Sequence, residues 1–133
     1  MAIILDADVI IRGEKGTFDL ATWLENQPNA PCEIAAITVA ELWHDVERSS
    51  GAHRLRREQY LRSISEALPI LPYTETTALE HARIWASLES SSKMIGAHDL
   101  IVAATALERG STVATFNRRH FANVPGLKVI EPR

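Results

Sequence analysis

Residues 2–10 read AIILDADVI, an aliphatic run that stops at the carboxylate of Asp6. Four consecutive apolar residues closed by an acid are typical of a buried strand in a parallel sheet, which is covered by apolar layers on both faces. Moving a carboxylate toward such an interior costs several kcal/mol unless a partner compensates it. This stretch therefore predicts a buried parallel strand whose carboxyl end carries an acid that needs a partner.

Three further oxygen-bearing side chains lie beside stretches that ought to be buried. Glu41 follows EIAAI at residues 33–37, Asp99 lies within IGAHDLIVAATAL at residues 95–107, and Asn117 follows TVATF at residues 112–116. Each acid alone has a structural explanation, as a turn residue or as an acid near the positive end of a helix. The four together favour a bound cation, because carboxylates rarely occur in such apolar surroundings without a partner.

Short aliphatic runs alternate with longer stretches of helical period, which is the pattern of helices that connect parallel strands. We therefore expect an α/β fold, a three-layer sandwich around a parallel sheet of about five strands. The expected strands cover residues 2–6, 33–37, 69–72, 112–116 and 127–130, and the expected helices cover residues 17–27, 38–49, 53–67, 75–90 and 96–109. Prolines at positions 28, 31, 69 and 72 mark element ends. In the fourth helix, an inward stripe is expected from Leu79, Ala82, Trp85 and Ala86.

The composition limits the possible classes of protein. A chain of 133 residues with 46% hydrophobic content suits one domain, residues 1–133. The formal charge of −3 excludes a generally basic nucleic-acid binder, so any RNA contact must be local. The single cysteine, Cys32, cannot form an internal disulfide and is expected to be a buried apolar residue. We find no signal sequence or long apolar span, so the expected compartment is the cytoplasm, without a membrane.

The expected topology brings the four oxygen-bearing residues to one edge of the sheet. Right-handed crossovers place strand ends and the starts of the following helices on a shared rim. Asp6 and Asn117 end strands, whereas Glu41 and Asp99 are expected in the first turns of helices. The candidate ligands are oxygen atoms, and the five histidines show no zinc-like pairing. Such a ligand set selects a hard ion such as Mg²⁺ or Mn²⁺. Such an ion, or a pair of them, suits hydrolysis of phosphate esters.

The order and spacing of these segments resemble a PIN-domain ribonuclease, specifically a VapC-type toxin of a toxin–antitoxin pair. IILDADVII is similar to the first strand and Asp motif of that family, ITVAELWHDVERS to its Glu helix, IGAHDLIVAATAL to its third acidic motif, and TVATFNRRHFANVPGLKVIEP to its closing segment. The resemblance spans nearly the whole chain. It implies RNA as substrate, endonucleolytic cleavage by activated water, a homodimer, and a VapB-type antitoxin that blocks the site with an inserted segment.

The resemblance also implies residue roles. Asp6, Glu41 and Asp99 would hold the metal, Asn117 stands where many relatives carry a fourth acid, and Thr115 would orient that neighbourhood. Asp8 stands where relatives often have Asn or Ser, so it either supplies the carboxylate that Asn117 lacks or is an ordinary turn residue. Four basic side chains near the expected rim are candidates for RNA binding or for simple solvated charge: Arg12, Lys15, Arg118 and Arg119.

Two other functions compete with the nuclease. A haloacid-dehalogenase-like phosphatase would use Asp6 as nucleophile and Asp8 as acid, but it would give Glu41 no role. A receiver-like signalling module would bind Mg²⁺ through the same two residues. That module needs a phospho-accepting Asp at the end of a middle strand, and PILPYTE at residues 69–75 has none. Both alternatives therefore rank below the nuclease.

Overall fold

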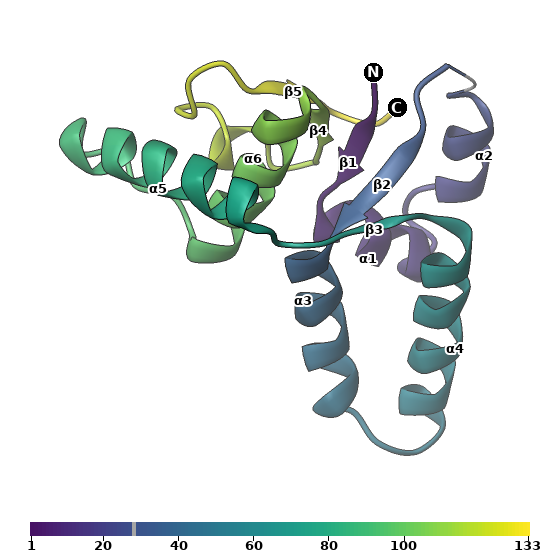
Figure 1. The fold of residues 1–133 in the computed structure, drawn as a ribbon. Coiled ribbons are helices and arrows are strands. Elements are labelled where there is room, and N and C mark those ends of the chain that lie inside the picture. Colours follow the sequence, from purple (N-terminus) through teal and green to yellow (C-terminus); the bar gives the residue numbers. More distant parts are fainter. Residues whose placement is uncertain (28) are drawn as a thin grey trace.

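All five strands of the structure lie parallel in one sheet. The computed structural model describes residues 1–27 and 29–133, so the expected end mark at Pro28 lies outside the described residues. The sheet order is β3-β2-β1-β4-β5, which places β1 and β4 side by side at its centre (Figure 1). The strands are β1 (Ile3–Leu5), β2 (Cys32–Ala35), β3 (Ile70–Leu71), β4 (Thr112–Ala114) and β5 (Lys128–Ile130).

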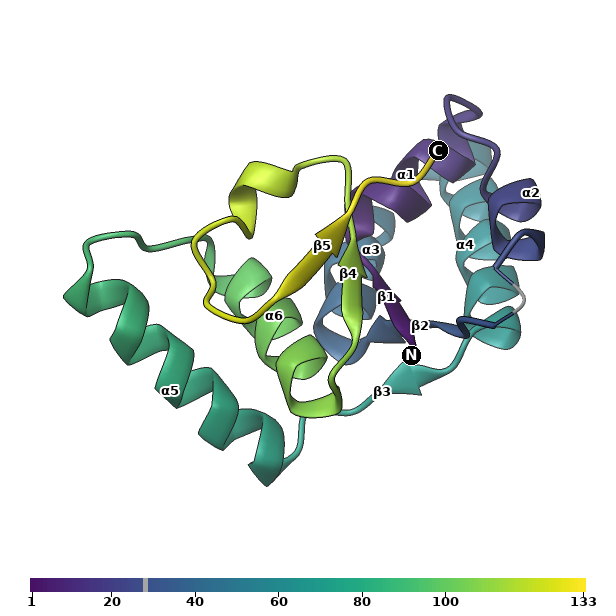
Figure 2. The ribbon, with the colours of Figure 1, turned by 90° about the horizontal axis from the view of Figure 1, so that it is seen from above.

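Helices cover both faces of this sheet, which confirms the expected three-layer α/β sandwich. The helices are α1 (Ala7–Lys15), α2 (Leu20–Glu25), α3 (Ala36–Glu47), α4 (Gly51–Ala67), α5 (Glu75–Ser90) and α6 (Ala97–Arg109), with a 3₁₀ turn, η1 (Arg118–His120). Helices α5 and α6 lie on one face of the sheet and α1 to α4 on the other (Figures 1 and 2). Ile4 packs with the buried side chains of α5 and α6, whereas Ile3 and Leu5 pack with those of α1 to α4. This alternation follows from the two-residue period of a strand.

Helix α1 was not expected from the sequence; Asp6 is its N-cap residue and Asp8 lies in its first turn. The Asp6 carboxylate accepts a hydrogen bond from the Ala7 backbone N–H at 2.9 Å and so caps this helix. Gly13 obscures the helical pattern, because glycine lowers helix propensity. The packing of α1 against Tyr60 explains why position 13 is a glycine. A Cβ at Gly13 would lie 2.7 Å from Tyr60 Oη, and this hydroxyl donates to the Ile10 carbonyl at 2.9 Å.

Other boundaries also differ from those expected. The helix expected over residues 17–27 is only the short α2, and α3 begins at Ala36, two residues early. Glu41 therefore lies in the second turn of α3 and not in the first. Among the described residues, no helix is both long and apolar enough to cross a membrane.

The inward stripe expected for α5 is wrong. Leu79 is 68% exposed and Trp85 is 47% exposed, whereas Thr77, Ile84 and Leu88 are buried. The start of the helix is as expected, because Thr74 and Thr77 form a capping box. Helix α5 packs mainly on α6 (Figure 2). Only a narrow stripe of the helix is therefore covered, and a second apolar stripe stays exposed.

We predict that Ile84→Ala lowers the free energy of unfolding by about 2–5 kcal/mol, because it leaves a cavity between α5 and α6. The exposed Leu55 of α4 is the matched control, and Leu55→Ala should cost less than about 0.5 kcal/mol. Urea denaturation followed by circular dichroism measures both. Equal losses for the two variants would contradict the observed burial of α5.

Candidate functional site

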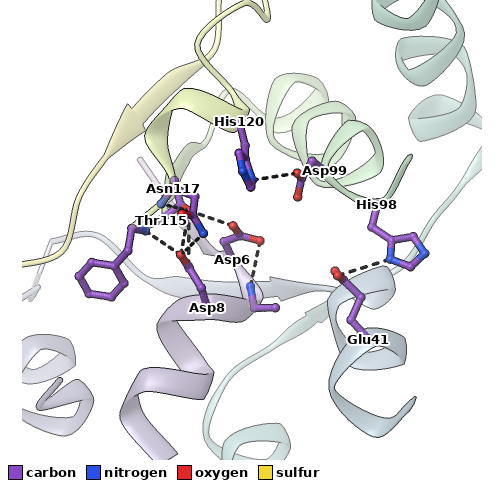
Figure 3. Close-up of polar contacts among 10 residues, drawn as sticks. Asp6, Asp8, Glu41, His98, Asp99, Thr115, Asn117 and His120 are labelled. Carbon is purple, nitrogen blue, oxygen red and sulfur yellow. Dashed lines mark hydrogen bonds and ion pairs between the residues drawn. The ribbon is translucent and has the colours of Figure 1, made fainter. Parts of the chain in front are cut away.

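The site begins where the central strands β1 and β4 end. The Asp6 N–H donates to the Ala114 carbonyl at 3.0 Å, so the residues that follow the two strands lie side by side. The Thr115 hydroxyl donates to Asp6 Oδ2 at 2.9 Å, and Asp6 is 7% exposed (Figure 3). Parallel pairing of two strands that are distant in sequence thus gives the buried carboxylate a fixed hydrogen-bond donor.

Asp8 projects from the first turn of α1 into the segment after β4. Its Oδ2 accepts the Phe116 N–H at 3.0 Å and the side-chain amide of Asn117 at 3.0 Å. Thr115 Oγ1 lies 3.4 Å from both Asp8 oxygens and accepts the Asn117 N–H at 3.0 Å. Asp8 is therefore not an ordinary turn residue: it is a helical acid that ties α1 to the loop carrying Asn117 (Figure 3).

Glu41 and Asp99 approach the pocket from α3 and α6, each beside a histidine. His98 Nδ1 lies 3.4 Å from Glu41 Oε2, and His120 Nδ1 lies 3.4 Å from Asp99 Oδ2 (Figure 3). Neither histidine was expected at the site, because the five histidines show no zinc-like pairing in the sequence. One signal was present for His98, which directly precedes Asp99 and shares its helix turn. His120 could not be found from sequence, because η1 brings it to Asp99 from a different part of the chain.

The carboxylates are close enough to affect one another's ionisation. Burial raises the pKa of Asp6, Asp8, Glu41 and Asp99, and in each case it is the largest cause. The negative charge of Asp6 raises the pKa of the other three further. The Thr115 hydrogen bond and the two histidines act in the opposite direction. The pocket therefore holds several like charges at a cost that a cation would relieve.

The donor set fits a hard divalent ion such as Mg²⁺ or Mn²⁺. Its acids supply only oxygen atoms, and Glu41 Oε1 is buried without a hydrogen-bond partner in the described part of the chain. Across residues 1–27 and 29–133, no three acidic, His or Cys side chains already lie close enough to coordinate one ion. Thr115, His98 and His120 each contact one of these carboxylates, and binding of one ion by Asp6, Glu41 and Asp99 would require the three carboxylates to move closer together.

The four basic candidates lie in different places. Arg12 stacks on the Phe116 ring, with its guanidinium carbon 4.2 Å from the ring centroid. Arg118 and Arg119 are exposed on η1, next to Asn117. Lys15 lies at the end of α1 and lines a hollow that also includes Asp45 and Arg57 but none of Asp6, Glu41 and Asp99. The structure therefore groups three of the four with the acids and separates Lys15 from them.

Comparison with known proteins gives one consistent family. Residues 3–127 match the PIN domain. The VapC ribonuclease Y4jK of Sinorhizobium fredii is 33% identical over 137 residues, which cover 98% of this chain and 96% of that protein. The structure of VapBC2 from Rickettsia felis, bound to a promoter DNA fragment, superposes with a TM-score of 0.91 at 22% identity and full coverage of both chains.

A second solved structure adds a comparison at higher identity. VapBC-5 from Mycobacterium tuberculosis, described as a member of the VapBC family of toxin–antitoxin systems, is 25% identical with a TM-score of 0.77. The likeness covers 98% of this chain and 99% of that one. Together with the central acids and the parallel sheet, these matches show that the chain belongs to the PIN-domain family and, within it, to the VapC-type proteins.

Proposed function

We propose that this protein is a divalent-metal-dependent endoribonuclease that hydrolyses RNA phosphodiester bonds by activated water and serves as the toxin of a toxin–antitoxin pair. The proposal rests chiefly on one observation: the carboxylates of Asp6, Glu41 and Asp99 come from three separate elements and face one common space (Figure 3), where the charge of Asp6 acts on the other two. The names of the relatives, which include a ribonuclease and a toxin–antitoxin complex, support the same reading. The expected compartment is the cytoplasm.

In this mechanism, Asp6, Glu41 and Asp99 would hold Mg²⁺ or Mn²⁺. Such an ion would supply Lewis-acid activation of water and would neutralise charge on the phosphate and on the leaving oxygen. Thr115 keeps Asp6 in one orientation through its 2.9 Å hydrogen bond. Arg12, Arg118 and Arg119 attract the phosphates of the RNA toward an otherwise negative pocket.

Asp8 and Asn117 work as a pair in this proposal. The 3.0 Å hydrogen bond between them places one carboxylate and one amide at the side of the pocket opposite Glu41 (Figure 3). Asp8 thus provides the fourth acid, and Asn117 holds that acid in position. With this arrangement, the pocket keeps four carboxylates although position 117 carries none.

The two alternative functions account for fewer of these contacts. A phosphatase with Asp6 as nucleophile leaves Glu41 and its buried oxygen without a role. It also requires Asp6 to be free for attack, whereas Asp6 caps α1 and accepts the Thr115 hydroxyl. A receiver-like module gives no role to Glu41 or Asp99. The nuclease uses all of the clustered acids.

An antitoxin is the second macromolecular partner in this proposal. A groove of about 660 Å³ lies between α2 and α4, with an apolar lining that includes Phe18, Leu20, Leu24 and Ile64. Such a groove suits the apolar face of an antitoxin helix. From there, an inserted segment of the antitoxin would reach the acidic pocket and block it.

The outward stripe of α5 suits a homodimer. Leu79, Ala82, Trp85 and Ala86 are exposed on one helix, and the His81 ring stacks on Trp85 at 5.5 Å between centroids. Two copies of α5 packed against each other would bury this apolar surface, and the alanines would allow a close approach. The stripe that the sequence pattern assigned to the core is then covered by a second subunit.

Asp99→Asn should lower RNA cleavage at least about a hundredfold, because it removes one negative charge from the cation site. Cleavage of structured RNAs with and without Mn²⁺ measures this effect. Glu66→Gln, at an exposed acid of α4, is the control and should cleave like the parent. Cleavage by the parent that persists in excess chelator would contradict the proposed metal dependence.

The paired role of Asp8 and Asn117 predicts a reciprocal rescue. Asp8→Asn alone should lower the cleavage rate by about tenfold or more, because the pocket loses a carboxylate. Adding Asn117→Asp should restore most of the rate, since the pocket regains its charge and the two positions keep one donor and one acceptor. Cleavage rates of the parent, both single variants and the double variant complete the cycle. If the Asp8→Asn variant cleaves RNA at the rate of the parent, Asp8 has only a structural role.

The homodimer proposal predicts that Leu79→Glu yields a monomer, because it places a charge within the apolar contact. Size-exclusion chromatography with light scattering should give about twice the protomer mass for the parent and the protomer mass for the variant. Leu55→Glu on α4 is the matched control and should stay dimeric. A monomeric parent would contradict the proposal, as would a Leu79→Glu variant that remains dimeric.

A further inference from the structure

Two hollows meet at Asp99 on the outer side of the acidic pocket. The first, about 350 Å³, is lined by Glu41, Gly96, Ala97, His98 and Asp99. The second, about 470 Å³, shares Gly96 and Asp99 with the first and extends toward η1. We call the second one the Asn123 hollow, and its remaining lining residues are Met94, Ile95, Arg119, His120 and Asn123.

Gly96 lines both hollows, next to Asp99. A Cβ at this position would lie 3.4 Å from Asp99 Oδ2, which is a tight contact with the carboxylate. The backbone at Gly96 has φ of −58°, which any residue adopts, so conformation alone does not require glycine. A side chain at position 96 would therefore occupy space beside the Asp99 carboxylate, where the two hollows meet.

The walls of the Asn123 hollow are anchored in the core. Ile95 packs against the cluster of buried side chains between the sheet, α5 and α6. On the opposite wall, Phe121 and Val124 are buried in the same cluster and fix the segment that carries Arg119 and Asn123. The hollow is thus a preformed surface feature, which lowers the entropic cost of binding a ligand.

The two walls offer different chemistry. Met94, which is 48% exposed, and Ile95 present an apolar surface, and a thioether makes favourable contacts with aromatic rings. Arg119 offers a guanidinium that suits phosphate, and Asn123 offers an amide with both donors and acceptors. A flat aromatic ring with polar edges, attached to a phosphate, matches this combination. An unpaired nucleotide has these properties.

We propose that the Asn123 hollow binds one unpaired nucleobase next to the scissile phosphate and sets a base preference there. This inference rests on the proposed ribonuclease function and names a specificity site for it. The base lies against Met94 and Ile95, the Asn123 amide hydrogen-bonds its edge, and Arg119 contacts the adjoining phosphate. The volume of the hollow, about 470 Å³, falls within the range of about 300–1,000 Å³ typical of small-ligand pockets.

The test is RNA binding in Ca²⁺ buffer, read by fluorescence anisotropy with labelled hexanucleotides of A, C or U. The parent should bind one of the three about tenfold more tightly than the weakest. Asn123→Ala and Met94→Ala should each reduce this ratio to about threefold or less. Arg119→Ala should weaken all three complexes equally, because a phosphate contact carries no base information. Asn26→Ala, at the exposed residue that follows α2, and Leu55→Ala, at an exposed site of α4, are controls and should match the parent.

Each outcome separates the base site from the function on which it depends. RNA binding without discrimination by the parent would overturn the base site and leave the nuclease proposal standing. The same holds if Asn123→Ala and Met94→Ala keep the parental ratio, or lower all three affinities alike. Absence of RNA binding, together with absence of Mn²⁺-dependent cleavage, would overturn both. A circular-dichroism melt of every variant shows whether a loss of binding reflects a loss of fold.

Discussion

Repulsion among carboxylates is the constraint around which this molecule is organised. Asp6 lies at the centre, and its charge raises the pKa of Asp8, Glu41 and Asp99. Burial adds to this cost, because the low-dielectric surroundings disfavour every ionised form. Such a cluster is stable only if other interactions hold it together. The sheet order does this by placing β1 between β2 and β4, so that the acids arise from separate, rigid elements.

The protein offsets the cost of this pocket in two ways. Locally, the Thr115 hydroxyl and the histidines at positions 98 and 120 contact the carboxylates and favour their charged forms. In the rest of the molecule, two apolar clusters on the two faces of the sheet stabilise the folded state, which the pocket destabilises. Gly13 allows α1 to approach Tyr60 of α4, and the buried Phe121 anchors the segment that follows Asn117. The site is therefore held by packing that lies outside it.

The parts of the fold that the sequence predicted are those with a strong local signal. The aliphatic runs predicted all five strands, and long periodic stretches predicted α3 to α6 to within a few residues. The strand-end positions of Asp6 and Asn117 and the early-helix position of Asp99 followed from the same pattern. Helix α1 was missed because its interior glycine and its short length weaken the periodic signal. The α5 stripe was misassigned, since an apolar stripe on a helix does not reveal whether the core of the same chain covers it.

The sequence by itself determined the class of fold and the identity of the acids, because strand periodicity and the cost of placing a carboxylate beside apolar residues are local properties. Only the tertiary structure decided which groups contact those acids. Thr115 reaches Asp6 across 109 positions of sequence, and Asn117 reaches Asp8 across the same separation. His120 joins Asp99 because η1 folds back over α6. Such contacts depend on how the elements pack in space. The sequence around a residue does not indicate which distant side chain it will contact.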